Sequence, residues 1–256
     1  MPTALITGGT VGIGHAFAKA LAERGYDLVL ASRDEAGLQH VAAALRTTYG
    51  IEVEIIPTDL AVRADVLALA ARLEDPERPI DLLVNNAGFA VHQSLLVKDF
   101  SVHERAIDVM CLALLILGGA AARAMKARGE GAILNVTSSS AVITTGNYSA
   151  VKAWATVYTE ALANELRGTG VRVMGLMPGW VKTEFHTRGG VKAHNLPDFV
   201  WIDVDQLVAG ALRDLARGKV LSVPTRRWAF AVTVGHIMPR VTSRWLSRAL
   251  TKSRDE

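Results

Sequence analysis

Short apolar-rich runs alternate with longer amphipathic stretches along most of the chain. The runs predict strands at residues 4 to 7, 27 to 31, 51 to 57, 80 to 84, 132 to 137, 171 to 177 and 219 to 224. Apolar residues recur at helical spacing between them, as in the stretches from about 99 to 128, 148 to 167 and 203 to 217. Alternating strands and helices are typical of an α/β fold with a doubly wound parallel sheet.

The composition fits one large globular domain. The chain has 256 residues, 50% of them hydrophobic, with neither a fixed-period repeat nor a low-complexity tract. We predict a single domain over residues 1–224, followed by an extension over 225–256 that belongs to the same domain or lies at its periphery. The one cysteine, Cys111, favours a packing role in a reducing compartment. The first strand begins almost at Met1, which leaves no room for a leader peptide, so we expect a cytoplasmic protein.

A glycine-rich turn joins the first strand to the first helix. The segment TGGTVGIG, residues 7 to 14, carries Gly8, Gly12 and Gly14 in the wide G-x-x-x-G-x-G spacing. Glycines here would let backbone N–H groups approach a pyrophosphate at the helix N-terminus. The turn taken alone is also compatible with a tight strand-to-helix connection that binds no ligand.

The end of the second strand bears on the choice of nucleotide. An acid at this place holds the ribose hydroxyls of NAD, whereas an arginine pairs with the 2′-phosphate of NADP. The chain has Ser32 and Arg33 there, followed by Asp34. We therefore favour NADP(H) over NAD(H), with Asp34 as the competing feature.

Further polar residues follow the third and fourth strands. Asp59 either caps the next helix or lies beside an adenine ring, and the residues alone leave both open. The fourth strand runs into Asn85, Asn86, Ala87 and Gly88. Ligands of doubly wound sheets bind at the carboxyl ends of the strands, which is where all of these motifs fall.

The candidate chemistry lies between residues 138 and 152. Ser138 ends an apolar strand, and Tyr148 and Lys152, four residues apart, share one helix face. An ammonium beside a phenol favours the phenolate, which would bring the pKa of the tyrosine closer to neutrality. Such a pair is acid–base machinery for an alcohol or ketone, although a lone Tyr-x-x-x-Lys pattern occurs on many ordinary helices.

These motifs, with PGWVKT at residues 178 to 183, resemble in order and spacing the short-chain dehydrogenase/reductase family. The resemblance covers residues 3 to about 223. It implies a seven-stranded Rossmann sheet, a nicotinamide cofactor, hydride transfer at a carbonyl carbon and no metal. It also implies that Tyr148 is the general acid, that Lys152 lowers its pKa and binds the ribose, and that Ser138 binds the substrate oxygen. The implied cofactor-binding residues are Thr7, Gly8, Gly12, Ile13, Gly14, Ser32, Arg33, Asp59, Leu60, Asn86, Ala87, Gly88, Tyr148, Lys152, Pro178, Gly179, Val181 and Thr183.

The chain departs from the family pattern in three places. Met110 stands where the family commonly has an asparagine that helps hold a proton-relay water, so either a backbone carbonyl suffices or catalysis is weakened. Ser138 and Tyr148 are only ten positions apart, which makes Ser139 or Ser140 an alternative to Ser138. More than thirty residues follow the final strand. A catalytically weak NADP(H)-binding sensor, or a membrane-associated scaffold, is therefore the alternative to a reductase.

The C-terminal extension is basic and amphipathic. Residues from Lys219 onward carry a net charge of +6, with Arg240, Arg244 and Arg248 at four-residue spacing and Val241, Trp245 and Ala249 beside them. We expect this helix to cover the substrate pocket or a neighbouring subunit, with peripheral membrane contact as the second interpretation. Both favour a hydrophobic substrate beneath a lid at about 183–202. No motif indicates nucleic-acid binding, and the resemblance implies a homodimer or homotetramer.

Overall fold

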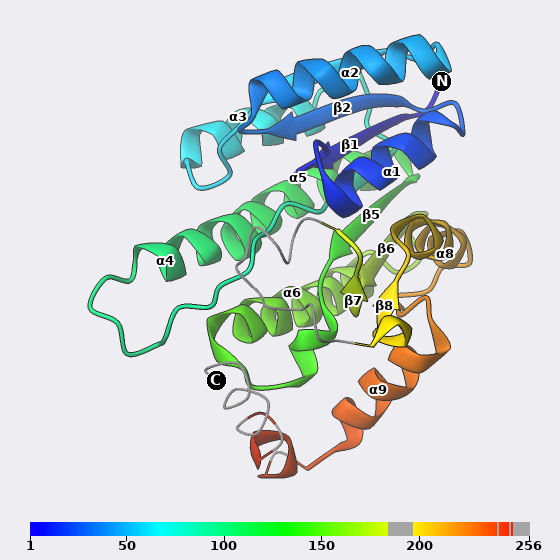
Figure 1. Cartoon of the computed structure of the whole chain (residues 1–256). Coiled ribbons are helices and arrows are strands. Elements are labelled where there is room, and N and C mark those ends of the chain that lie inside the picture. The colour runs from blue at the N-terminus through cyan, green and yellow to red at the C-terminus, as the bar shows by residue number, and fades with distance from the viewer. Residues whose placement is uncertain (184–196, 240, 246, 248–256) are drawn as a thin grey trace.

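The computed structural model describes residues 1–183, 197–239, 241–245 and 247, and its centre is a seven-stranded sheet (Figure 1). The strand order is β3-β2-β1-β4-β5-β6-β9, and every neighbouring pair is parallel. The strands are β1 Thr3–Thr7, β2 Asp27–Ser32, β3 Val53–Pro57, β4 Leu82–Asn85, β5 Gly131–Val136, β6 Val171–Leu176 and β9 Leu221–Ser222. The doubly wound, seven-stranded prediction is confirmed, although the last strand is only two residues long.

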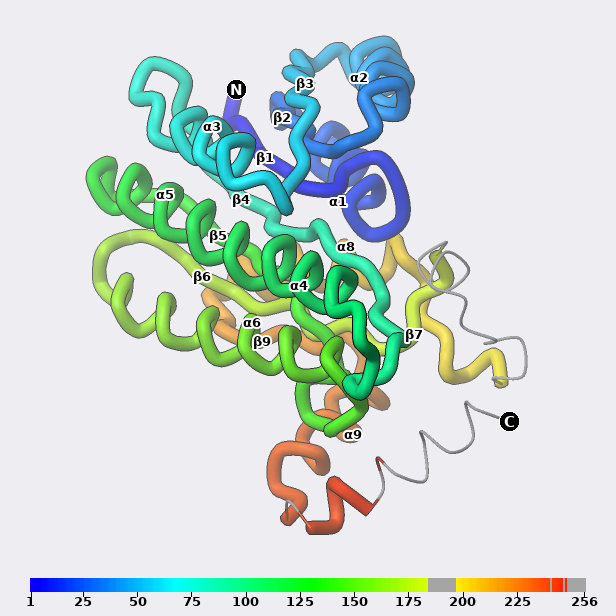
Figure 2. The backbone as a smooth tube through the Cα atoms, turned by 90° about the vertical axis from the view of Figure 1, so that its left-hand side faces the viewer, coloured from blue at the N-terminus to red at the C-terminus, as the bar shows by residue number. Residues whose placement is uncertain are grey.

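Helices cover both faces of the sheet (Figure 2). Buried residues of α1 (Gly12–Ala22), α2 (Glu35–Tyr49) and α8 (Val204–Ala216) form one apolar layer. Those of α3 (Arg63–Leu73), α5 (Ala113–Arg128) and α6 (Gly146–Glu165) form the other. The period of two along each strand explains this division, since Ala4 and Ile6 of β1 join the first layer while Leu5 between them joins the second.

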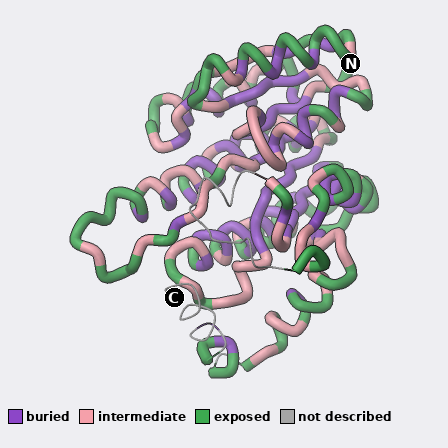
Figure 3. Tube along the Cα trace, in the orientation of Figure 1, coloured by how far each residue is buried: buried purple, intermediate pink, exposed green. Residues whose placement is uncertain are grey.

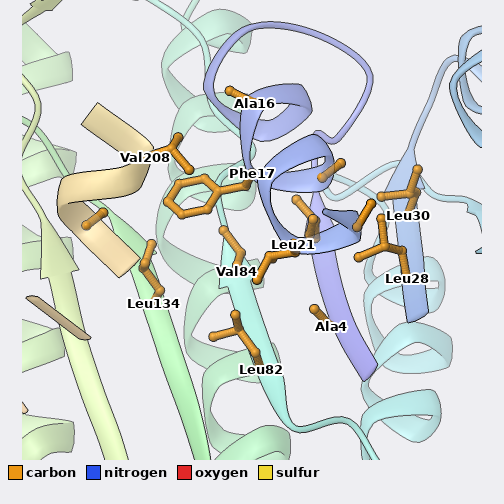
Figure 4. Packing of buried hydrophobic residues seen from close by; sticks show 14 of the residues in the cluster. Ala4, Ala16, Phe17, Leu21, Leu28, Leu30, Leu82, Val84, Leu134 and Val208 are labelled. Carbon is orange, nitrogen blue, oxygen red and sulfur yellow. The ribbon is translucent and has the colours of Figure 1, made fainter. Parts of the chain in front are cut away.

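The first layer is held together by a buried aromatic ring. Phe17 of α1 is fully buried and lies between Val208 of α8 and the sheet residues Val84 and Leu134 (Figure 4). Colouring by burial shows the same division across the molecule, with a buried sheet and exposed outer helix faces (Figure 3). Because this packing fixes α1 against β1 and β4, it also fixes the glycine turn that precedes α1.

The long apolar helix is continuous but changes its winding part-way. It comprises α4 (Ser101–Ile107), a π-helical turn at Asp108–Leu112, and α5. By length and composition the run Ser101–Arg128 could cross a membrane, since it holds an 18-residue window with a mean hydropathy of 1.8, yet 56% of that window is buried inside the protein. A core helix passes the same test, and the packing of α5 in the second apolar layer gives it that role.

The C-terminal third contains elements that the apolar pattern did not predict. Two short strands, β7 (Trp180–Val181) and β8 (Trp201–Ile202), form a separate parallel pair, and a 3-10 turn, η3, covers Asp198–Val200. The predicted lid at 183–202 falls largely on residues 184–196, which lie outside the described residues. The extension forms a helix, α9, over Arg226–Ile237, and residues 241–245 are again helical after Pro239. Arg240, Arg248 and Ala249 lie outside the described residues.

Candidate active site

The glycine turn lies where the strand order reverses, between β1 and β4. Gly8 and Gly12 have φ of 68° and 56°, which L residues rarely adopt. A Cβ on Gly14 would lie 2.1 Å from the carbonyl oxygen of Gly8, so only glycine fits there. Val11, at the N-cap of α1, has a side chain that cannot accept from the first N–H groups of the helix. The turn thus has the form of an anion cradle at a helix N-terminus.

Polar contacts tie this turn to the segment after β4. The side-chain amide nitrogen of Asn86, Nδ2, donates to the carbonyl oxygens of Thr7 and Gly8 at 2.9 and 3.1 Å. The buried hydroxyl of Thr7 accepts from the N–H groups of Asn86 and Ala87. Thr7 therefore shapes the site through the backbone, since its hydroxyl is committed to this junction.

The acid that competed with Arg33 has another partner. Asp34 is the N-cap of α2, and its carboxylate accepts from the N–H of Gly37 at 3.0 Å. A carboxylate used in this way stabilises the helix start by about 1 kcal/mol. The Arg33 side chain is exposed at the end of β2, close enough to Asp59 to influence its ionisation.

Asp59 is held by a residue that the sequence motifs did not indicate. The guanidinium of Arg105, on α4, donates to both carboxylate oxygens of Asp59 at 2.7 and 2.8 Å. Burial opposes ionisation of Asp59, but the hydrogen bonds from Arg105 and from the N–H of Ala61 outweigh it and lower the pKa of the carboxyl. The N-cap of α3 is Val62, so of the two alternatives that the sequence left open for Asp59, the helix cap is excluded. Only a three-dimensional contact across 46 residues places Arg105 here.

Ser138 and Tyr148 meet at the carboxyl end of β5. Ser138 begins a 3-10 turn, η2 (Ser139–Val142), and its hydroxyl accepts from the N–H of Ser140. The same hydroxyl forms a hydrogen bond with the phenol of Tyr148, on the first turn of α6. Among the three serines that the sequence left open, the structure brings Ser138 to the phenol.

Lys152 lies one turn further along α6 and is deeply buried. Its ammonium donates to the carbonyl oxygen of Val136 at 2.9 Å and lies 5.8 Å from the centre of the Tyr148 ring. Burial lowers the pKa of Lys152 to about 8. Burial also raises the pKa of Tyr148 to about 12, although the hydrogen bond from Ser138 opposes it. The predicted lowering of the tyrosine pKa is therefore wrong for this structure, because loss of hydration outweighs the hydrogen bond with Ser138.

Met110 lies beside this lysine, inside the π-helical turn. Its side chain is 2% exposed, and a Cβ on Gly88 would lie 3.1 Å from its sulfur and 3.5 Å from the Lys152 ammonium. A cavity of about 10 Å³, lined by Met110, Lys152, Thr7 and Asn85 among others, lies next to them. That volume matches about one water molecule.

The segment after β6 connects the two halves of the site. The carbonyl oxygen of Pro178 accepts from the N–H of Ser139 at 2.9 Å, which fixes the turn that follows Ser138. Val181 is buried and pairs with Ile202, while Thr183 lies against Gly12 of the glycine turn. The residues predicted for the phosphates, the nicotinamide side and the catalytic group thus converge. Ser32, Arg33, Asp59 and Leu60 lie at the β2 and β3 ends.

The C-terminal helix α9 lies beside β8 and η3 (Figure 1), and it packs against the segment after β6. A Cβ on Gly179 would lie 2.1 Å from the Trp228 ring, so the indole rests directly on the backbone there. The indole N–H donates to the carbonyl oxygen of Val200, and Arg227 donates to that of Phe199. Further along, a Cβ on Gly235 would meet Val142 of η2 at 2.5 Å.

The comparisons with known proteins place these features in a family. A family model described as short chain dehydrogenase matches residues 2–190. The chain belongs to the short chain dehydrogenase family. This dehydrogenase is 34% identical to one from Sphingobium yanoikuyae solved in complex with NADPH, with a TM-score of 0.84 over 92% of this chain and 94% of that one.

Two further relatives have names that state an activity. The bulky-bulky ketone specific alcohol dehydrogenase from Comamonas testosteroni is 27% identical, with a TM-score of 0.79 over 92% of each chain. The ketoacyl reductase HetN from Nostoc sp. (strain PCC 7120) is 30% identical over 225 residues, which is 86% of this chain and 77% of the relative. The short chain dehydrogenase described here is therefore an oxidoreductase that acts on CH–OH or C=O groups.

Proposed function

We propose that this protein is an NADP(H)-dependent reductase of hydrophobic ketones, with Ser138, Tyr148 and Lys152 as its catalytic residues. The hydrogen bond between the Ser138 hydroxyl and the Tyr148 phenol carries the proposal. It places a proton donor and a fixed hydrogen-bonding group at one point, where a substrate oxygen would receive both.

The residues present fit a bound nicotinamide nucleotide. Gly8, Gly12, Ile13 and Gly14 supply a backbone cradle for its phosphates, with a close approach that a Cβ at Gly14 would block. At the ribose end, Arg33 is exposed while Asp34 is used as a helix cap, which favours a 2′-phosphate over free hydroxyls. The NADPH complex of the Sphingobium relative supports the same choice.

The protein's own groups would manage the proton and the substrate oxygen. The bound nucleotide supplies the hydride. The pKa of Tyr148, raised to about 12 by burial, keeps the phenol protonated at neutral pH, so it is ready to protonate the developing alkoxide. Ser138 holds the oxygen in line, and the Lys152 ammonium stabilises charge nearby. The proton donor is thus poised for reduction more than for oxidation.

The surroundings of the site favour an apolar substrate. Trp180 and Trp201 lie edge to face, with ring centres 5.8 Å apart, and Trp228 packs against the neighbouring Gly179. Aromatic surfaces of this size bind apolar ligands through contact area rather than charge. Two relatives, a ketone-specific alcohol dehydrogenase and a ketoacyl reductase, support a substrate of this class.

We also propose a cytoplasmic homodimer or homotetramer. Leu112 and Leu115 on the long helix are each 43% exposed, and Val157 on α6 is 66% exposed. Apolar side chains on neighbouring helices form a surface that a second subunit would cover.

The test is a titration with NADPH and NADH in parallel, followed by NADPH consumption with ketones of increasing chain length. We expect tighter NADPH binding and turnover that rises with apolar bulk. Tyr148→Phe removes the donated proton and should lower kcat/KM by about 10²-fold to 10⁴-fold, with NADPH binding unchanged. Turnover by Tyr148→Phe equal to that of the unaltered protein would contradict the catalytic assignment.

One observation supports the weaker alternative, an NADP(H)-binding sensor with little catalysis. Met110 places a thioether, which binds water poorly, beside Gly88 and in the lining of the small cavity next to Lys152. If this blocks resupply of the proton, the protein binds NADPH tightly but turns over none of the ketones. Met110→Asn would then restore turnover, whereas in an active reductase it changes the rate little.

A further inference from the structure

The helix α9 has two apolar faces, and within the part of the chain that the structure describes only one of them is covered. Trp228, Val232 and Gly235 recur at helical spacing and pack on the protein, with Val232 only 5% exposed. Phe230 and Ile237, seven residues apart, lie on the opposite side and are 72% and 76% exposed. Large apolar side chains that gather on an exposed helix face mark an interaction surface. The outer face of α9 therefore has the character of a binding face.

In the helical segment that follows α9, residues 241–245 with Ser247, polar side chains are buried and apolar side chains are exposed. Ser243 and Ser247 are 4% and 2% exposed, and the Ser247 hydroxyl accepts from the N–H of Thr144 at 3.0 Å. Val241 and Trp245, also four residues apart, are each 69% exposed. Serines inside and valine and tryptophan outside are the opposite of what water favours. Two consecutive helical segments thus present large apolar side chains outward.

The surface around these side chains is strongly positive. From residue 215 to residue 254 the sequence has no Asp or Glu. Between α8 and α9 lies a groove of about 330 Å³ whose lining includes Arg213, Arg217, Lys219 and Arg226. The one acid in that lining, Asp214, is already paired with Lys219 at 2.8 Å. The groove and the apolar faces therefore match a partner that combines negative charge with an apolar interior.

This charge argues against a second copy of the chain as that partner. In a two-fold symmetric dimer the same patch lies on both sides of the interface. Arg226 and Arg244 would then approach their own copies, and opposed like charges cost several kcal/mol. An anionic lipid surface offers the complementary charge together with a depth of apolar chains for the exposed rings.

We propose that the outer face of α9 and the segment 241–245 bind the interface of an anionic lipid bilayer. Phe230, Ile237, Val241 and Trp245 enter the region between headgroups and acyl chains, while the arginines and Lys219 contact the phosphates. The inner face of α9 simultaneously rests on the substrate side of the active site. An apolar substrate dissolved in the bilayer would then lie next to the entrance.

The experiment is co-sedimentation of the full chain with vesicles of phosphatidylcholine alone or mixed with about 30% phosphatidylglycerol. We expect partition into the anionic vesicles at least tenfold above that into neutral ones, and a steep decrease with added salt. The pair Phe230→Ser with Trp245→Ser should weaken partition by about tenfold or more. Arg226→Gln with Arg244→Gln should weaken it by about fivefold for each charge.

Leu67→Ser is the matched control, because Leu67 is a 48% exposed leucine on α3, outside the extension. It should leave vesicle binding unchanged. NADPH binding and reduction of a water-soluble ketone should be the same in all of these variants, so failure here is distinguishable from failure of the proposed reductase. The proposal is overturned if the full chain ignores anionic vesicles, or if the Phe230→Ser and Trp245→Ser pair instead converts an oligomer to smaller species.

Discussion

The proposed cofactor side and the proposed substrate side of this site are built in different ways. The cofactor side consists of turns close to their own strands, where Gly8, Gly12 and Gly14 set the backbone and Asp34 caps the next helix. The substrate side is assembled from distant pieces, since Trp228 rests on Gly179 and Ser247 binds Thr144.

Substitutions on the two sides should therefore have different effects. A change in the glycine turn should act locally on nucleotide binding, because the backbone N–H groups of the turn would themselves bind the phosphates. A change in α9 acts through packing, so it should loosen the substrate loops while the sheet and the nucleotide site persist. Four measurements test whether nucleotide binding and substrate turnover respond separately.

The largest effect is expected for Gly14→Ala. Its Cβ would lie 2.1 Å from the Gly8 carbonyl oxygen, so the turn must open and several N–H groups move away from the phosphates. Each charge-assisted hydrogen bond is worth about 1.5–3 kcal/mol, so we expect NADPH affinity to fall by more than about 100-fold. Gly9→Ala is the control, since the one tight contact of its Cβ would be with the flexible end of Leu30, at 3.0 Å, and its contacts with Ile6 would be ordinary ones. If calorimetry gave the same NADPH affinity for Gly14→Ala as for the unaltered protein, the glycine turn would not be the phosphate-binding site.

Trp228→Ala should affect the other side. Removing the indole from Gly179 and Val200 leaves a cavity and should cost about 3 kcal/mol in the free energy of unfolding, the low end for a tryptophan because the ring is only partly buried. Reduction of bulky ketones should slow while the Kd for NADPH stays constant. Trp245→Ala, which removes a 69% exposed ring, should change neither stability nor turnover. A matching loss of NADPH affinity in Trp228→Ala would show that the two sides are not separable.

Arg33→Gln should narrow the difference between the two nucleotides. Loss of a guanidinium facing the 2′-phosphate weakens NADPH by about tenfold or more and leaves NADH nearly unchanged. Titrations followed by nucleotide fluorescence measure both. If NADPH and NADH affinities fall together, Arg33 acts on the turn and not on the phosphate.

The last prediction is a pH dependence of kcat/KM, caused by the ionisation of Lys152. Burial lowers the pKa of Lys152 to about 8, so its ammonium is largely present at pH 7 and is lost as the pH rises through about 8. The pKa of Tyr148, about 12, keeps the phenol protonated throughout this window. We expect kcat/KM for reduction to be flat below about pH 7 and to fall about tenfold per unit above pH 8. Lys152→Arg should remove this step, and a step that persists in the variant belongs to another group.

Sequence patterns were most informative where a structure depends on neighbouring residues. The strand-and-helix alternation predicted the parallel sheet, and the helical stretch predicted at 203 to 217 corresponds to α8, Val204–Ala216. These elements follow from period, turn chemistry and capping, which all act over a few positions.

The remaining features depend on tertiary contacts. The pKa of Tyr148 was predicted in the wrong direction because its burial is created by packing that a motif does not show. The pairing of Asp59 with Arg105 joins residues 46 positions apart, and β7 and β8 are two-residue strands with too little pattern to detect. The extension was predicted as one amphipathic helix, whereas the described part has α9 ending before Pro239.

The hydrogen bond from Thr144 to Ser247 spans 103 residues and involves one of the last residues of the chain. During synthesis, the glycine turn and its first strands leave the ribosome long before this partner exists. We therefore expect a growing chain to form the glycine turn early, while the loop between Ser138 and Tyr148 takes its final shape only after Ser247 has emerged. The order of emergence would thus delay completion of the proposed catalytic loop until that contact forms.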